Sequence, residues 1–339
     1  MKIKELVCGL VLLSLCCQAA FASDQMKLTS SVERLGTAYH DTHDGQTPDE
    51  PITTNSFFAN KYTFEIINAP SGLDEELAAI EDNAIAVIEY LSDYVEWQGT
   101  LDFAVWFLPY DYFDVNGLGL LPSLGGEGDS GYTWAAEEAF TGVDANGDYP
   151  DIGCFILPNE NGSLTNYGRP LSFDPSPDFY KDYSPPAGTD DFASIFLHEL
   201  GHSMALWSDT EEFKNLTISD GDHLDFIGAN VAELLGQNLN MAHEGSIDHY
   251  GPTPAISDAS PSVDRGLMYM YGNYEQNRWH LGKLDLAILK DFGWKTANSG
   301  FLDLVEQASS VPTEKPLKAG EQAPARFINL MESIRGLGR

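Results

Sequence analysis

The chain has 339 residues, with 18 Lys and Arg against 52 Asp and Glu, which gives a formal net charge of −34. This length is sufficient to bury a substantial hydrophobic core. A surface of such negative charge repels nucleic acids and anionic membranes, so we expect neither as a partner.

Residues 1–22 have the pattern of a secretory signal peptide. Two lysines precede an apolar run that ends in the small-residue pattern AFA, and cleavage is expected after it. No later apolar run is long enough to span a bilayer, so we expect a secreted or periplasmic protein; an uncleaved membrane anchor is the alternative. Cleavage leaves Cys154 as the one remaining cysteine, which excludes an internal disulfide.

The chain after the signal begins with a polar stretch, residues 23–60, which predicts an extension or pro-segment without a core of its own. Hydrophobic periodicity then predicts a strand, an amphipathic helix and a second strand, followed by a Gly-rich loop and a third strand. These elements cover residues 62–67, 73–95, 101–109, 117–131 and 151–158. We expect Cys154, in the last strand, to be a buried core residue.

The central segment DDFASIFLHELGHSMALW predicts a buried helix over residues 191–206. The chain beyond it is rich in loops, with short helices expected at 230–239 and 281–294. These elements indicate an α+β fold, with an upper lobe at 61–207, a lower lobe at 208–295 and a linker or tail at 296–339.

The central helix contains the sequence His-Glu-Leu-Gly-His. His198 and His202 lie four residues apart, so they project from the same face of the helix and can bind one zinc ion. Glu199, on the adjacent edge, can reach a water bound to that ion and act as general base and then as general acid. Without a metal, two histidines in a buried helix would need other partners. The sequence therefore predicts a catalytic zinc site.

A catalytic zinc site of this kind needs a third protein ligand. The residues alone leave five candidates open, which are Asp209, His223, Glu233, His243 and His249. Asp209 follows the helix so closely that it could coordinate only if the chain turned sharply. Glu233 would be the ligand in a gluzincin-type peptidase, although its helix lacks the residues expected around it.

The order of these motifs resembles that of the metzincin zinc metalloproteases, in particular the leishmanolysin-like proteases and their secreted bacterial relatives. The resemblance covers about residues 61–295 and rests on HELGH followed by FIGANVAELLG, SIDHYG, GLMYMYG and LGKLDLAILKDFGW. The compact metzincin motif is absent, because Ala205 and Ser208 occupy the positions of its Gly and third His. The resemblance implies that His249 is a third ligand delayed by an insertion, and that Met268 forms the Met-turn under the metal.

The same resemblance implies a fold and an activity. The fold would be zincin-like, with a twisted mixed sheet and a long active-site helix in the upper lobe and a smaller, loop-rich, helical lower lobe. The activity would be zinc-dependent hydrolysis of peptide bonds in a protein or peptide substrate, and we expect a monomer. A secreted adhesin that keeps the zincin scaffold without turnover is the alternative from another class.

Residues 144–151, DANGDYPD, suggest a second metal. Asp144, Asn146 and Asp148 alternate, and Asp151 follows closely, as at the start of a calcium-binding loop. The segment lacks the sixth-position Gly and the distal Glu of an EF-hand. A calcium site is therefore one interpretation, and an ordinary Asx-rich turn is the other.

Overall fold

The structure is a computed structural model. It describes residues 52–53, 58, 60–109, 119, 123–128, 130–144, 146–147, 149–179, 183–220, 223–241, 249 and 278–297. The predicted signal peptide, nearly all of the predicted extension and tail, His243 and Met268 lie outside these residues.

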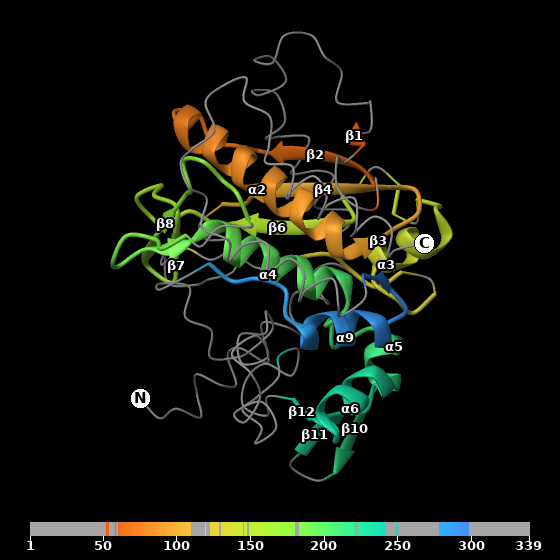
Figure 1. Ribbon diagram of the computed structural model, residues 1–339. Helices are drawn as coiled ribbons and strands as arrows, with labels where there is room; N and C mark the ends of the chain where they lie inside the picture. Colours follow the sequence, from red (N-terminus) through yellow and green to blue (C-terminus); the bar gives the residue numbers. More distant parts are fainter. Residues whose placement is uncertain are drawn as a thin grey trace, which may run out of the picture.

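A mixed five-stranded sheet lies in the upper half of the fold (Figure 1). Its strands are β1 (Ile52–Thr53), β2 (Lys61–Ile67), β4 (Thr100–Phe107), β5 (Ser123–Leu124) and β6 (Ile152–Ile156). Their order is β1-β2-β4-β6-β5; β2, β4 and β6 run parallel, and the two outer strands are antiparallel to their neighbours. The three predicted strands are thus confirmed. The Gly-rich stretch, expected to be a loop, contributes the edge strand β5.

Apolar side chains bury both faces of the sheet. Val105 and Cys154 belong to the main hydrophobic core on one face, while Ala104 and Phe155 face a smaller cluster on the other. Successive side chains of a strand point to opposite faces, so burial on both sides explains the continuous apolar runs of β4 and β6. Cys154 is fully buried with a free thiol, as expected.

Two helices, α2 (Asp74–Tyr94) and α4 (Phe192–Met204), pack against each other beside the sheet (Figure 1). In α2 the buried side chains recur at helical spacing, so one face of the helix is apolar. In α4 almost every side chain is buried, as expected for a helix inside the molecule. The side chain of Asp191 begins α4 by accepting a hydrogen bond from the Ser194 backbone N–H at 3.2 Å.

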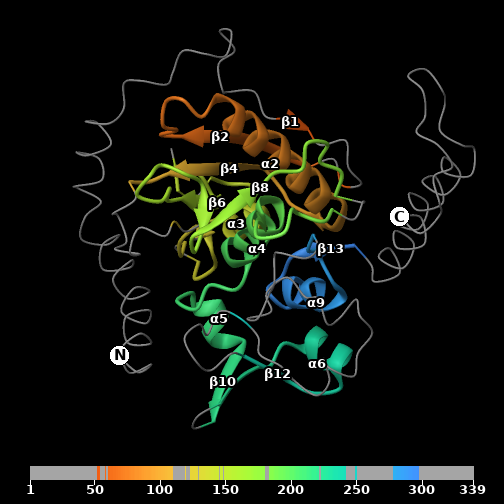
Figure 2. The same ribbon diagram turned by 90° about the vertical axis from the view of Figure 1, so that its left-hand side faces the viewer.

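Several shorter elements complete the fold, and the sequence analysis missed most of them. The upper part adds β3 (Val95–Glu96), α3 (Trp134–Thr141), β7 (Thr165–Asn166), β8 (Arg169–Ser172) and β9 (Asp190–Asp191). The later part adds α5 (Glu211–Asn215), β10 (Thr217–Asp220), β11 (His223–Phe226), α6 (Ala229–Leu235), β12 (Leu239–Asn240), α9 (Lys283–Asp291) and β13 (Lys295–Thr296). In Figure 2, α6, β10 and β12 lie below α4 and α9.

The helix predicted at 230–239 is shorter than expected. It ends at Leu235, because Gly236 adopts a left-handed φ of 70° and closes the last turn. The chain then forms β12, which pairs with β11.

One hydrophobic core joins the two predicted lobes. Phe226 and Val231 from beyond residue 208 belong to the same cluster as Leu91 and Leu200 from before it. The observed fold class is therefore α+β, with the later elements packed directly on the earlier ones. Among the described residues, no helix combines the length and the hydropathy that crossing a membrane would require.

Candidate metal centre

Helix α4 is fixed at both ends by polar contacts. At its start, the buried Arg278 pairs with Asp191 at 3.2 Å. Further along, the Ser123 hydroxyl of β5 donates to the Glu199 carbonyl oxygen at 2.9 Å, and the Ser203 hydroxyl donates to the Leu124 carbonyl oxygen. These contacts hold the helix against the edge strand of the sheet, so the side chains of its HELGH segment project from a rigid element.

His249 joins the two histidines of α4, although it lies 51 residues beyond His198 in the chain. The Nε2 atoms of His198 and His249 are 2.9 Å apart, and the rings of His202 and His249 have centroids 4.7 Å apart. All three histidines offer a ring nitrogen within 4.8 Å of the other two. Within the part of the chain that the structure describes, this is the one group of three or more His, Cys, Asp or Glu that converges so closely.

A backbone carbonyl orients the ring of His202. Its Nδ1 lies 2.9 Å from the carbonyl oxygen of Leu206. Because a carbonyl can only accept, Nδ1 carries the hydrogen and donates, which leaves the lone pair on Nε2. Metal-binding histidines are commonly held in this way through their second nitrogen.

Burial favours the neutral form of two of the three histidine rings, His202 and His249. It lowers the pKa of His202 to about 4. Burial, together with the nearby positive charge that His202 and His198 would carry, lowers the pKa of His249 well below its ordinary value. Neutral imidazole is the form that binds a metal ion, so these two rings need lose no proton before they bind one.

Glu199 lies between the two histidines of α4 in sequence and retains partial access to solvent. Desolvation raises the pKa of its carboxyl well above the ordinary value, while the backbone amide of Ser123 acts in the opposite direction. A carboxyl group in such surroundings can both accept and donate a proton.

Tyr167 is a candidate that the sequence analysis missed. It occupies the turn between β7 and β8 with φ 50°, followed by Gly168 with φ 81°. Positive φ at both central positions is the geometry of a type I′ turn, which normally takes Asn, Asp or Gly first. Desolvation and then the charge of Glu199 raise the pKa of the phenol, although the side chain is 64% exposed. The Glu199 carboxyl group therefore lies within electrostatic reach of the Tyr167 hydroxyl group. The sequence signal was NYG, a turn with an unusual first residue.

The other predicted site residues do not join the histidine group where the structure describes them. Glu233 is exposed on α6, and Asp209 lies apart from the three histidines. His223 begins β11, but its side chain is not among the described parts, and His243 and Met268 lie outside them altogether. Ala205 has φ −149°, so the chain leaves α4 without the left-handed turn that would require glycine.

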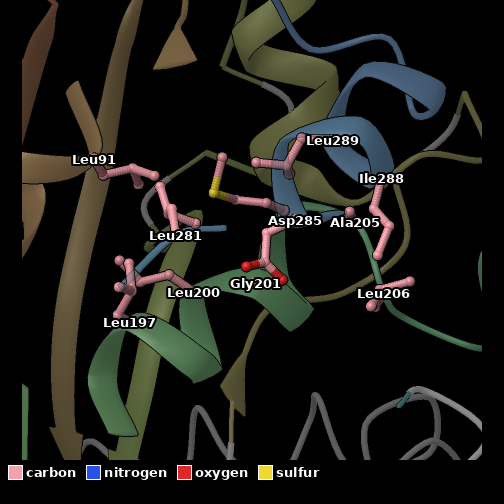
Figure 3. Close-up of a pocket in the computed structure, with 11 residues that line it drawn as sticks. Leu91, Leu197, Leu200, Gly201, Ala205, Leu206, Leu281, Asp285, Ile288 and Leu289 are labelled. Atoms are coloured by element: carbon pink, nitrogen blue, oxygen red, sulfur yellow. The ribbon is translucent and has the colours of Figure 1, made fainter. Parts of the chain in front are cut away.

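A small cavity lies on a different face of α4 (Figure 3). Its volume is about 20 Å³, roughly the space of one water molecule. Its lining is apolar apart from Asp285, whose carboxylate accepts the Gly282 N–H at 2.8 Å at the start of α9. This cavity is a gap in the packing, and a substrate would not fit in it.

Comparison with protein-family models, with curated proteins and with solved structures gives no match. The functional conclusion therefore depends on the geometry of the site itself.

Proposed function

We propose that this protein is an exported, zinc-dependent endopeptidase with a zincin-like, metzincin-type arrangement. The observation that carries the proposal is the position of His249, which meets His198 and His202 from a distant part of the chain. A chance HExxH sequence in a helix gives no reason for a third histidine to meet the first two. Three imidazoles are also a known ligand set of catalytic zinc, with the fourth position left for water or substrate.

The donor set fits zinc on chemical grounds. Imidazole nitrogen suits a borderline-soft ion such as zinc, and the neutral state of His202 and His249 matches what coordination requires. The Leu206 carbonyl leaves Nε2 of His202 available for the ion. When bound, zinc would polarise a scissile carbonyl and make water more acidic.

Glu199 would carry the proton transfers of the reaction. Its carboxylate would take a proton from the attacking water as the new C–O bond forms, and would give that proton to the leaving amine as the C–N bond breaks. The rigid attachment of α4 to β5 through Ser123 and Ser203 would hold this carboxylate in place. Tyr167 would contact the substrate on the side of Glu199.

The mixed sheet supports the finer description of the fold, because α4 lies against its edge strand β5. Glu199 favours a catalytic role over a binding role. An adhesin with the same three histidines would not need a proton carrier beside them. Residues 1–22 support export.

The test combines zinc content with cleavage of unfolded casein by the mature protein. We expect about one zinc per chain after reconstitution. Glu199→Gln should keep the zinc, because Glu199 is not a proposed ligand, and should lower the cleavage rate about 10²- to 10⁴-fold, as loss of a general base does. Glu75→Gln, an exposed change in the first turn of α2, is the matched control and should alter neither. Zinc well below half an equivalent, or unchanged cleavage by Glu199→Gln, would contradict the proposal.

A further inference from the structure

Four acidic side chains gather where β4 and β6 begin, away from the histidines. Asp102 is in β4, Glu138 in α3, Asp144 in the loop after α3, and Asp151 directly before β6. We call these four residues the acidic cluster. The Asp102 backbone N–H donates to Oδ2 of Asp151 at 2.8 Å, and the Asp151 N–H donates to the Asp102 carbonyl oxygen at 2.9 Å. These two hydrogen bonds fix the two aspartates side by side.

Two members of the acidic cluster, Asp151 and Glu138, are buried without a compensating positive charge. Asp151 is 1% exposed and Glu138 is 5% exposed. The ion pairs formed among the described residues do not include either of them. Burial and the surrounding acidic groups raise the pKa of Asp151 to about 8 and that of Glu138 to about 7. Buried carboxylates normally have a cationic partner or a metal ion, because an uncompensated buried charge is strongly unfavourable.

Two buried oxygens beside the cluster accept no hydrogen bond. Oδ1 of Asp151 is one, although Oδ2 of the same carboxyl group is satisfied. Oδ1 of Asn146 is the other; the amide nitrogen of that side chain donates to the Tyr149 carbonyl oxygen at 2.7 Å. Buried oxygens are rarely left without a donor, so the unpaired Oδ1 of the 1% exposed Asp151 indicates a place for a positively charged ligand.

We propose that Asp102, Glu138, Asp144, Asn146 and Asp151 bind one calcium ion. The donors are all oxygens, most of them carboxylates, and calcium takes 6–8 oxygen ligands in flexible geometry. A loop supplies Asp144 and Asn146, which suits calcium better than magnesium, since magnesium demands a near-ideal octahedron. The site is distinct from the histidine group, whose nitrogen donors suit zinc.

The loop after α3 must close slightly to complete the site. No three of the described carboxylates have oxygens all within 4.8 Å of one another. Asp144 is exposed, and its Oδ1 accepts the N–H groups of Asn146 and Gly147 at 3.1 and 2.7 Å, which keeps the loop compact. Calcium would draw this loop toward Asp102 and Asp151.

The experiment uses the mature protein freed of metal and then titrated with Ca²⁺ alone. Calorimetry should show one site, and saturating Ca²⁺ should raise the unfolding midpoint by about 5 °C or more. Glu138→Gln and Asp151→Asn should each bind Ca²⁺ at least tenfold more weakly. Without metal, and at a pH above the pKa values of about 8 and 7, both variants should unfold at the same or a higher temperature than the parent, because each then removes a repelling charge. A merely structural role would instead lower the midpoint under both conditions.

Controls separate this site from other possibilities. Glu137→Gln, the adjacent change in α3, should leave Ca²⁺ binding unchanged, and so should His202→Ala in the zinc site. If Glu138→Gln or Asp151→Asn does not fold, Asp144→Asn, in the exposed loop, should weaken binding at least threefold. Ca²⁺ binding that these changes leave intact would place the ion elsewhere on this acidic chain and overturn the proposal. It would equally be overturned if Ca²⁺ had no effect and lowering the pH from 8 to 6 stabilised the protein instead.

Discussion

His198, His202 and His249 bring three ring nitrogens to within 4.8 Å of one another, whereas no three carboxylates of the acidic cluster come so close. Asp151 and Glu138 are as buried as His198 and His202, so burial does not explain the difference. Charge does. Neutral imidazoles can pack together without an ion, because they do not repel, but buried carboxylates repel until a cation or protons neutralise them. A site of neutral donors can therefore be formed in advance, while a site of anionic donors is completed by its ligand.

The backbone that carries the histidines is also more rigid than the backbone that carries the acidic cluster. The histidine pair projects from α4, which is bonded to β5 and held at its start by the Arg278–Asp191 ion pair. The acidic cluster takes Asp102 from β4 and Asp151 from the position directly before β6, but Asp144 from an exposed loop. We therefore expect the histidine site to hold its geometry in the metal-free protein, and the acidic cluster to tighten on binding.

The sharpest test of the preformed site is His249→Ala. Removal of one of three ligands should weaken zinc binding at least about 100-fold, more than loss of an outer-shell partner does, and should abolish cleavage of casein. Competition with a chelator of known affinity measures the first effect. The unfolding midpoint without metal should fall only modestly, because the variant loses the hydrogen bond between His249 and His198 but no charged interaction.

Two matched histidine variants make this result specific. His243→Ala and His223→Ala should keep most of the zinc and most of the activity. If His243→Ala lost both while His249→Ala kept both, the third ligand would be His243, and the comparison between the two sites would lose its basis.

A smaller effect measures whether the two sites act independently. They share no residue, although the Thr133 hydroxyl at the start of α3 donates to the Met204 carbonyl oxygen at the end of α4. Independent sites give additive changes in the free energy of unfolding, to within about 0.5 kcal/mol. We expect His202→Ala, Glu138→Gln and the double variant to obey this rule with both metals present. A coupling clearly above 1 kcal/mol in chemical denaturation would show that one ion rearranges the other site.

The sequence predicts these sites to different extents, for a physical reason. An α-helix brings positions i and i+4 together, so the pairing of His198 with His202 follows from spacing alone. The approach of His249 depends on a long path of the chain, and only the resemblance to a family pointed to it. Residues 144–151 were recognisable as a possible calcium loop because its alternation is local. Asp102 and Glu138 carried no such signal, because tertiary packing brings them there.

The helices and strands were likewise predictable only where their sequence pattern is local and long enough to show a period. The long strands and the helices α2 and α4 were predictable, because their apolar periodicity extends over several turns or a whole strand. β5, β7 and β8 have two to four residues each, too few to show a period, and the eight-residue α3 is barely longer. Tyr167 was missed because the hairpin that carries it was missed.

The two sites also differ in which residues adopt a positive backbone φ beside them, and this difference has the smallest expected effect. Beside the acidic cluster, positive φ is taken by Gly142 and Gly147, at 69° each. On the side of Glu199 it is taken by Tyr167, where a left-handed conformation costs a residue with a Cβ about 1–2 kcal/mol. Strain of this kind persists at functional sites when the side chain itself is needed.

Tyr167→Asn should therefore raise the stability of the protein and lower its peptidase activity. Asn tolerates the left-handed region, as Asn68 does here with φ 55°, so the variant should gain about 0.5–1 kcal/mol and unfold a few degrees higher. Loss of the exposed ring beside Glu199 should lower kcat/KM for a peptide substrate about tenfold, since each 1.4 kcal/mol of lost transition-state binding is a factor of ten. Tyr167→Phe keeps the ring and the strain, so its stability should match the parent, and any loss of activity it shows measures the hydroxyl alone. If the Asn variant is less stable than the parent, Tyr167 is not strained in this turn. If the Asn variant is as active as the parent, Tyr167 does not contact the substrate.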